Sequence, residues 1–187
     1  MAQGVFSPAP IKKAHYIWLK EGIVYGNYGS DNYNIGVTRN GSSFQLVNTI
    51  KRINVDGAYG PIKNMRRVTQ CYGTLTINFL KLTYTNLAYG YNITVSDGTD
   101  KDGTYKQIQP RLGFESTDVL TNIAYVGQKM DGQNCIIYVN NALNVTPNTQ
   151  FPLSEKDEVV SPMMYEGFYS YSSPTTVPVE IWDYIPT

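Results

Sequence analysis

Two turn signals a few residues apart constrain the fold of this chain more than any other feature. The dipeptides Asp56-Gly57 and Gly60-Pro61 both favour tight turns. A strand-like run enters this region over 49–55, and another leaves it over 68–82. Together they predict a β-hairpin with a long tip. The tip also carries three cations: Lys63, Arg66 and Arg67. Because such a tip contributes little to its own core, the residues alone leave two interpretations open. One is an ordinary solvated tip, which the residues favour, and the other is a tip that contacts another molecule.

The segment from Thr74 to Phe79 has the clearest strand pattern. Side chains of a strand point alternately to its two faces, and here one face is apolar while the other is polar and uncharged. The apolar residues are Leu75, Ile77 and Phe79, and the polar ones are Thr74, Thr76 and Asn78. We therefore expect the first face to pack in the core, and the second to be hydrated or to lie against polar groups.

Most of the remaining sequence also reads as β structure separated by turn residues. Further strands are expected over 15–19, 23–25, 37–55, 119–126, 135–139, 159–169 and 177–184. The dipeptide Asn40-Gly41 predicts that the 37–55 segment breaks into a short hairpin. Residues 84–89 ahead of Gly90 fit a short helix with Gly90 as its C-terminal stop, but tyrosine and threonine are poor helix formers, so the residues alone support it weakly. Loops are expected over 26–34 and 170–176, and an exposed acidic loop over 96–103.

The length of 187 residues suits one domain that buries its own core. We expect residues 1–13, which include Pro8 and Pro10, to form a flexible arm. Residues 14–187 are expected to form a single β-sandwich domain of two packed antiparallel sheets. The first residues lack the features of a signal peptide, and no stretch reaches the roughly 18 apolar residues of a membrane span. We therefore expect a protein that stays in a cytoplasm or joins a particle assembled there.

Charge and composition favour self-association over nucleic-acid binding. Lysine plus arginine equals aspartate plus glutamate, 15 against 15, and charged residues make up only 16% of the chain, below the roughly 25% of an average domain. Copies of a neutral protein repel one another weakly, whereas dedicated nucleic-acid binders are normally basic. The 16 tyrosines suit both pleated sheets and protein interfaces.

No pattern for catalysis or metal binding stands out in the sequence. The single histidine, His15, excludes zinc motifs that need two or three histidines in one chain. The nucleophile elbow, the phosphate loop and the dinucleotide fingerprint are absent from the sequence. Asp97, Asp100 and Asp102 lack the register of an EF-hand, which favours a solvated turn over a calcium loop. We therefore expect no enzyme, no catalytic residue, no cofactor and no metal.

The two cysteines, Cys71 and Cys135, lie far apart in strand-like runs. Buried free thiols are typical of such cysteines in a cytoplasmic protein. A single disulfide between them is the alternative.

The turn-rich segment 56–63, Asp-Gly-Ala-Tyr-Gly-Pro-Ile-Lys, resembles the Asp-Gly-x-x-Gly-Pro-hydrophobic-Lys signature of major tail tube proteins of long-tailed bacteriophages. The segment 35–44 is similar to a Gly-x-Thr-x-Gly-Gly-x-x-Phe segment that precedes this hairpin in the family. Further similarities lie at 75–87, 121–127, 141–143 and 156–158, so the resemblance spans roughly residues 35–185. Asn64 stands where the family usually has glycine, and asparagine tolerates a positive φ better than other non-glycine residues. Lys81 reverses a charge that relatives often carry there.

The resemblance implies a structural virion protein of the tail, made and assembled in the cytoplasm of a bacterial host. Its fold would be mainly β, with one short helix and a long hairpin loop. Copies would form rings, expected to be hexameric, and stacked rings would form the tail tube through which double-stranded DNA is ejected. Partners would be other copies, the tape measure, tail tip and tail terminator proteins, and DNA that passes without specific binding; no membrane is involved. The residues expected to contact the neighbouring ring or subunit are Asp56, Gly57, Gly60, Pro61, Lys63, Arg66 and Arg67.

The wall of such a channel should be hydrated and poor in cations, because each added cation strengthens binding to DNA phosphates. Thr74, Thr76 and Asn78 meet this requirement and are the candidates for facing the lumen; an outward, solvent-facing strand is the alternative. A second interpretation of the whole protein is a carbohydrate-binding β-sandwich module. In that case the loop 26–33, rich in tyrosine and glycine, would form a sugar-stacking surface.

Overall fold

The computed structural model of the chain describes residues 22–31, 33–36, 38–54, 56, 57, 59, 60, 62–80, 83–129, 132–146 and 160–184. Within these ranges the protein is mainly β, with one α-helix and two antiparallel sheets, as the sequence predicts. The arm expected over 1–13 and the strand expected over 15–19 lie outside the described residues.

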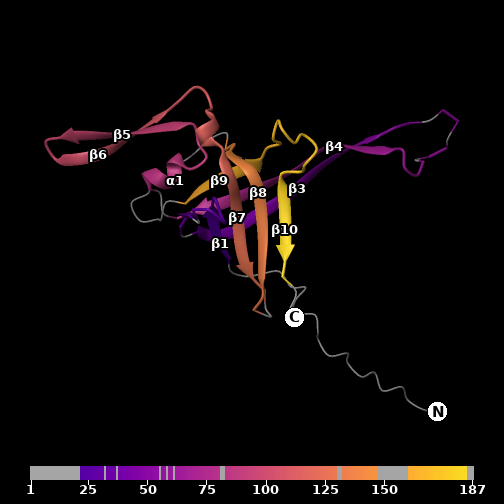
Figure 1. Ribbon diagram of the computed structural model, residues 1–187, viewed down its shortest axis with the longest axis horizontal. Helices are drawn as coiled ribbons and strands as arrows, with labels where there is room; N and C mark the ends of the chain where they lie inside the picture. Colours follow the sequence, from indigo (N-terminus) through magenta and orange to yellow (C-terminus); the bar gives the residue numbers. More distant parts are fainter. Residues whose placement is uncertain are drawn as a thin grey trace, which may run out of the picture.

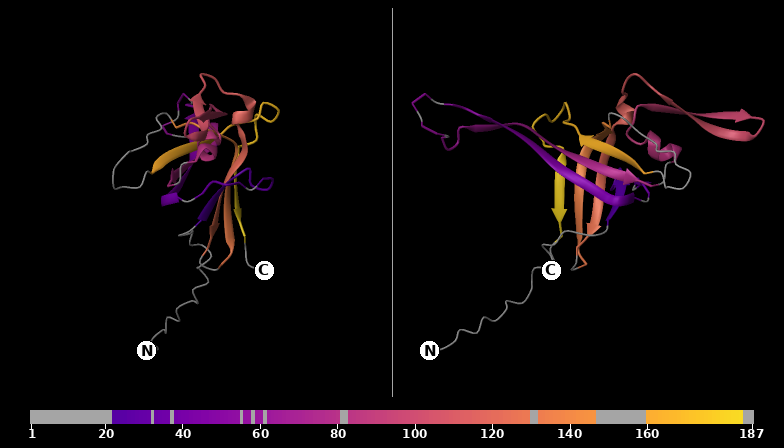
Figure 2. Two further views of the ribbon diagram at one scale, coloured as in Figure 1. Left: turned by 90° about the vertical axis from the view of Figure 1, so that its left-hand side faces the viewer. Right: turned by 180° about the vertical axis from the view of Figure 1, so that it is seen from behind.

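The larger sheet has eight antiparallel strands in the order β2-β1-β7-β8-β9-β4-β3, with β10 paired to β8. Their bounds are β1 Gly22–Gly26, β2 Tyr33–Asn34, β3 Thr38–Arg52, β4 Arg66–Phe79, β7 Leu120–Gln128, β8 Asn134–Asn144, β9 Ser161–Gly167 and β10 Val179–Asp183. Strands β3 and β4 cross β7, β8 and β10 obliquely, and the view from behind brings β3 and β4 to the front (Figures 1 and 2). The sheet therefore forms two layers, β1-β7-β8-β10 and β9-β4-β3.

Strand β8 connects the two layers. Its first part, Cys135–Val139, pairs with β7 and β10, whereas its end, Ala142–Asn144, pairs with β9. The core lies between the layers and consists of Val24, Ile35, Leu75, Ile77, Phe79, Leu120, Ile123, Val139, Ala142, Met163 and Tyr165. This confirms the predicted apolar face of the strand over 74–79. The core is thus enclosed by two parts of one folded sheet rather than by two separate sheets.

Four expected strands near the C-terminal end correspond to β7, β8, β9 and β10. Of the segments expected as loops, residues 27–31 and 170–176 consist of turns and irregular backbone, apart from a single bridge between Ser170 and Ser173. Gly26 instead ends β1, and Tyr33–Asn34 form the two-residue strand β2. Cys71 and Cys135 are free thiols, as predicted.

Helix α1 (Tyr84–Ala88) confirms the expected helix. The Thr83 hydroxyl accepts a hydrogen bond from the backbone N–H of Asn86 at 3.1 Å and caps the N-terminus. Gly90 has a φ of +70°, the conformation that commonly ends a helix. The buried Asn86 side chain donates to the carbonyl of Ile35 at 2.7 Å, which attaches the helix to the core.

The smaller sheet is a hairpin of β5 (Ile93–Asp100) and β6 (Gly103–Pro110). The prediction of a loop over 96–103 is therefore wrong, because these residues continue β5, turn at Lys101-Asp102 and enter β6. Aspartate and glycine are poor strand formers, but here each has a cross-strand partner. Gly98 lies opposite Tyr105, whose ring occupies the space above the glycine, and Asp97 lies opposite Lys106.

The prediction of a short hairpin at Asn40-Gly41 is also wrong. Strand β3 continues through this dipeptide, with a register irregularity between Thr38 and Ser42 and a φ of +75° at Gly41. The side chain of Asn78 donates to the carbonyl of Gly41 at 3.1 Å. A bulge uses the positive φ of glycine without reversing the chain, so the long pairing with β4 outweighs the local turn preference.

Candidate functional site

The predicted long hairpin is formed by β3, β4 and the residues between them. Its ladder reaches the pair Arg52 and Arg66, and the backbone N–H of Ile53 donates to the carbonyl of Met65 at 2.9 Å. Gly57 has a φ of +85° and Asn64 a φ of +68°. Asn64 therefore takes the left-handed conformation, which asparagine tolerates better than other non-glycine residues.

The distal part of the hairpin projects away from the core and is exposed on both faces (Figures 1 and 2). Several large apolar side chains on it face solvent: Leu46, Ile50, Ile53, Tyr59, Ile62, Met65 and Val68. Asp56, Gly57, Gly60, Lys63, Arg66 and Arg67 are exposed too, whereas Pro61 lies outside the described residues. An exposed row of apolar side chains of this kind commonly marks an interaction surface.

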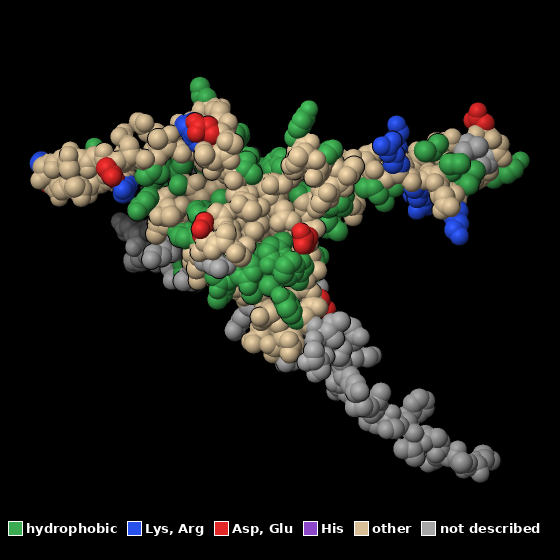
Figure 3. All heavy atoms as spheres, viewed as in Figure 1, with side chains coloured by type: hydrophobic (Ala, Val, Ile, Leu, Met, Phe, Trp, Pro, Cys, Tyr) green, Lys and Arg blue, Asp and Glu red, His purple; other side chains and the backbone are tan. Residues whose placement is uncertain are grey.

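Four cations form a collar just below the tip. Lys51 lies directly opposite Arg67, and Arg52 lies directly opposite Arg66. Like charges that face each other across a ladder are destabilising. No ion pair joins these four side chains to a carboxylate in the part of the chain that the structure describes. We call Lys51, Arg52, Arg66 and Arg67 the cationic collar. Lysine and arginine side chains, drawn in blue, gather on the β3-β4 hairpin in Figure 3.

The collar makes the charge distribution of this neutral protein uneven. From position 51 to 67 the chain carries five cations and one carboxylate, which is a net charge of +4. Because the whole chain has a formal net charge of zero, the rest carries −4. The hairpin therefore presents a positive surface to any negatively charged partner.

The three lumen-facing candidates lie on the outer face of the β9-β4-β3 layer. Thr74 is buried and lies between Gln45 of β3 and Glu166 of β9. Thr76 and Asn78 are half-buried. This face is thus packed in part against polar neighbours. Burial raises the pKa of the Glu166 carboxyl.

A groove of about 700 Å³ runs along the base of the hairpin. From Arg66 to Gly73, β4 pairs with β3 alone among the described strands, because β9 pairs only from Thr74 onward. The Tyr169 hydroxyl donates to the carbonyl of Cys71 across this open edge. Other residues that line the groove include Tyr72, Glu166, Phe168, Pro174 and Val177.

A row of aromatic rings covers the outer face of the other layer. Ring centroids lie 5.4 Å apart for Tyr25 and Tyr28, 5.8 Å apart for Tyr28 and Tyr138, and 4.7 Å apart for Tyr138 and Trp182. The Glu180 carboxylate accepts hydrogen bonds from the indole N–H of Trp182 at 3.0 Å and from the Asn140 amide at 3.1 Å. Sequence reasoning identified the loop that contains Tyr28, but missed Trp182 and Glu180. These two residues are two positions apart in β10 and so lie on the same face of the strand, a spacing that is visible in the sequence.

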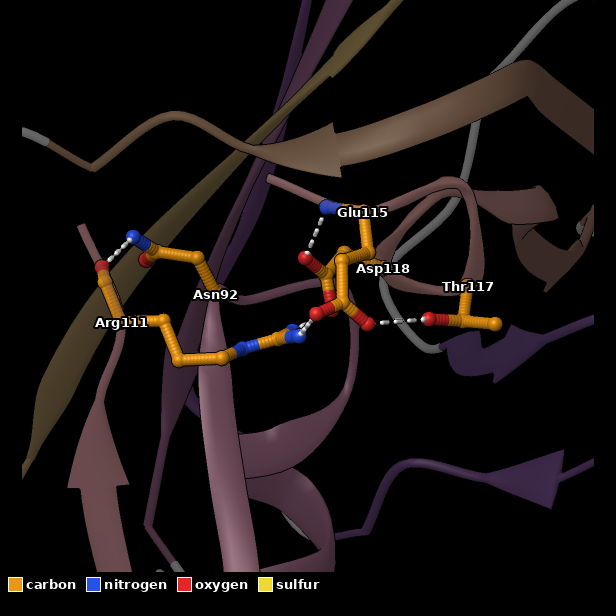
Figure 4. A network of polar contacts seen from close by, with 5 residues as sticks. All are labelled: Asn92, Arg111, Glu115, Thr117 and Asp118. Carbon is orange, nitrogen blue, oxygen red and sulfur yellow. Dashed lines mark hydrogen bonds and ion pairs between the residues drawn. The ribbon is translucent and has the colours of Figure 1, made fainter. Parts of the chain in front are cut away.

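A polar network holds the base of the β5-β6 hairpin (Figure 4). The Arg111 guanidinium forms ion pairs with Glu115 and with the buried carboxylate of Asp118. The backbone N–H of Arg111 donates to the carbonyl of Asn92 at 2.7 Å. The backbone N–H of Glu115 donates to Asp118 at 2.8 Å, which closes the short 3-10 helix Ser116–Asp118. This network is structural and fixes where the hairpin leaves the body.

Lys129 is a buried cation that the sequence did not reveal, because it lies beside a turn. Its ammonium donates to Asp183 at 2.6 Å and to the carbonyl of Tyr184 at 2.7 Å, which ties β10 to the end of β7. No cluster of three histidine, cysteine, aspartate or glutamate side chains suited to a metal occurs within the described ranges.

No model of a protein family matches this chain, and no curated protein matches it. In the described part of the molecule, no helix has the length and apolar character needed to span a membrane.

Proposed function

We propose that this protein is a structural subunit that assembles with copies of itself into stacked rings, as a tail tube protein of a long-tailed bacteriophage. The rings would be hexameric, and the tube would conduct double-stranded DNA. The proposal rests on the sequence resemblance, and one structural observation carries it furthest. That observation is the long hairpin, whose apolar and cationic side chains project from the core without partners of their own among the described residues.

The open edge of β3 supports the same proposal. Among the described strands, β3 pairs only with β4, so its outer edge is free from Thr38 to Arg52. Exposed strand edges favour association with other chains. A neighbouring subunit that adds its own edge strand there would extend the sheet, and a closed ring of subunits would leave no free edge.

In such a tube, the polar face of the β9-β4-β3 layer would line the channel. Thr76 lies opposite Ser43 and Met164 on the neighbouring strands, and neither of these is charged. The cross-strand neighbours of Thr76 therefore offer no cation to bind DNA phosphates. Placing lysine at Thr76 should therefore slow DNA ejection from intact particles.

Negative-stain electron microscopy of the purified protein tests the proposal directly. We expect tubes for the wild type and few or short tubes for the triple variant Lys63→Ser, Arg66→Ser and Arg67→Ser. The matched control replaces three exposed residues outside both projecting hairpins, Asp31, Thr117 and Thr121, with serine. Normal tubes from the cation variant would contradict the role of the hairpin, and a wild type without tubes at any concentration would contradict the proposed function.

A carbohydrate-binding module is the second candidate, and the aromatic row favours it. Trp182 is 45% exposed on a strand face, with the hydrogen-bonding groups of Glu180 and Asn140 beside it. Aromatic rings next to polar side chains suit small ligands with apolar and hydroxylated faces. Calorimetric titration with neutral oligosaccharides, with Trp182→Ala as the control, tests this candidate; absence of binding would remove it.

A further inference from the structure

The two hairpins of the molecule lie at opposite ends of its longest axis (Figure 1). One is the β3-β4 hairpin with the cationic collar, and the other is the β5-β6 hairpin. Every residue of β6 is exposed, so this second hairpin contributes little to the core. A projecting hairpin that buries so little surface adds little to the stability of its own domain, which suits a role in binding a partner.

The β5-β6 hairpin is nevertheless held firmly at its base. Arg111 connects it to the buried Asp118 (Figure 4). Lys106 forms an ion pair with Asp97 and lies 5.4 Å from the ring centroid of Tyr84 on α1. The contacts of Arg111 with Asp118 and of Lys106 with Tyr84 join the hairpin to the body, which suits an element that docks on a partner.

The two hairpins differ in charge. The tip of β5-β6 carries Asp100 and Asp102, which form no ion pair in the described part of the chain, and Lys101 lies between them. Asp97 is already paired with Lys106. The cationic collar, in contrast, consists of two opposed pairs of like charges. A carboxylate brought between the members of such a pair would relieve their repulsion.

We propose that the cationic collar of one copy docks on the β5-β6 hairpin of a second copy, with Asp100 and Asp102 as its counter-charges. Exposed apolar side chains lie near both contact points, Ile50 and Val68 beside the collar and Tyr105 on β6. This inference rests on the proposed function, and adds to it the surface of the neighbouring subunit that receives the long hairpin.

A contact of this kind joins two different surfaces of the same chain. Such heterologous contacts produce a closed ring when the rotation between subunits closes, and an open filament when it does not. Because the two hairpins lie at opposite ends of the molecule, each copy can donate its collar to one neighbour while its β5-β6 hairpin receives another. The contact is electrostatic and should weaken as salt is added.

Charge reversal with mixing tests the proposal. The collar-reversed variant carries Lys51→Glu, Arg52→Glu, Arg66→Glu and Arg67→Glu, and the tip-reversed variant carries Asp100→Lys and Asp102→Lys. All six residues are exposed, so both variants should fold, which circular dichroism checks. In sedimentation velocity, each variant alone should need at least about a tenfold higher concentration to associate than the wild type does. An equimolar mixture should associate again, because each collar then meets a tip of opposite charge. The control Asp31→Lys, an exposed change in the loop after β1, should associate normally.

Failure of the folded mixture to associate would overturn the proposal, as would wild-type association in both variants alone. Loss of binding to a random-sequence DNA duplex in the collar-reversed variant, with its self-association unchanged, would show that the collar binds nucleic acid instead. Electron microscopy separates this inference from the proposed function. Restored association without tubes would support the contact and contradict the tube, whereas normal tubes from both variants would support the tube and contradict the contact.

Discussion

The two ends of strand β4 lie in very different surroundings. From Thr74 to Phe79 the strand is paired on both sides, and Leu75, Ile77 and Phe79 are buried in the core. From Arg66 to Gly73 it pairs with β3 alone, and most of its side chains are exposed. One continuous strand thus serves as core at one end and as a projecting surface at the other. The difference shows that regular pairing alone does not make a segment part of the core, because the second layer covers only one end.

The largest expected difference between the two ends concerns stability. Ile77→Ala should lower the free energy of unfolding by about 2–5 kcal/mol, because it leaves a cavity in the core. Ile50→Ala, on the exposed hairpin, should change it by no more than about 0.5 kcal/mol. Urea unfolding of both variants measures the contrast. Similar losses would mean that the hairpin packs against something in the isolated subunit.

The next difference concerns the reactivity of the two thiols. Cys71, half-buried at the base of the hairpin, should react with iodoacetamide at least about tenfold faster than Cys135 in the native protein. Cys135 lies in the core-forming part of β8, and burial raises the pKa of its thiol, which lowers the thiolate fraction. Mass spectrometry of partially labelled protein measures the two rates. In denaturant the rates should converge, and unequal rates there would assign the difference to local sequence instead.

A smaller effect is expected from the cationic collar. Arg67→Glu would place a carboxylate opposite Lys51 and should raise the free energy of unfolding of the isolated subunit by about 0.5 kcal/mol. Arg67→Gln, the matched control, removes the repulsion without adding attraction and should give a smaller gain. Both are measured by urea unfolding at low salt. A loss of stability in the glutamate variant would indicate that Arg67 has a favourable partner within the subunit.

The smallest expected effect is at Glu166, beside the buried Thr74. Burial raises the pKa of Glu166 in the folded state above its unfolded value, so its contribution becomes less favourable as pH rises through the folded pKa. Glu166→Gln should therefore be more stable than the wild type at pH 7, by less than about 0.5 kcal/mol because the side chain is partly exposed. The gain should vanish near pH 3, where the carboxyl is neutral in both states. Equal stability at pH 7 would show that the carboxylate is well solvated.

The fold could be predicted from the sequence wherever local pattern and tertiary environment agree. The alternation of Leu75, Ile77 and Phe79 identified core positions because a strand with one buried face has period two. The same approach failed at Asn40-Gly41 and over 96–103, where residues typical of turns lie inside paired strands. In both cases cross-strand partners far along the chain outweighed the local preference.

The candidate site, too, could be predicted only in part from the sequence. The turn dipeptides and the cations of the long hairpin are visible in the sequence, because turn geometry depends on neighbouring residues. The opposition of Lys51 to Arg67 and of Arg52 to Arg66 depends on the strand register. The row from Tyr28 to Trp182 brings together side chains from distant segments.

By itself, the sequence determined that the chain is mainly β and that a long cationic hairpin follows residue 49, whereas the short helix Tyr84–Ala88 was expected mainly from the resemblance. Only the tertiary structure decided that one folded sheet encloses the core, that residues 93–110 form a second projecting hairpin, and that Lys129 is buried against Asp183. The physical reason is the separation along the chain of the residues that interact. Alternation and turn chemistry are set within a few residues, whereas layer packing, register and ion pairing join residues that meet only when the chain has folded.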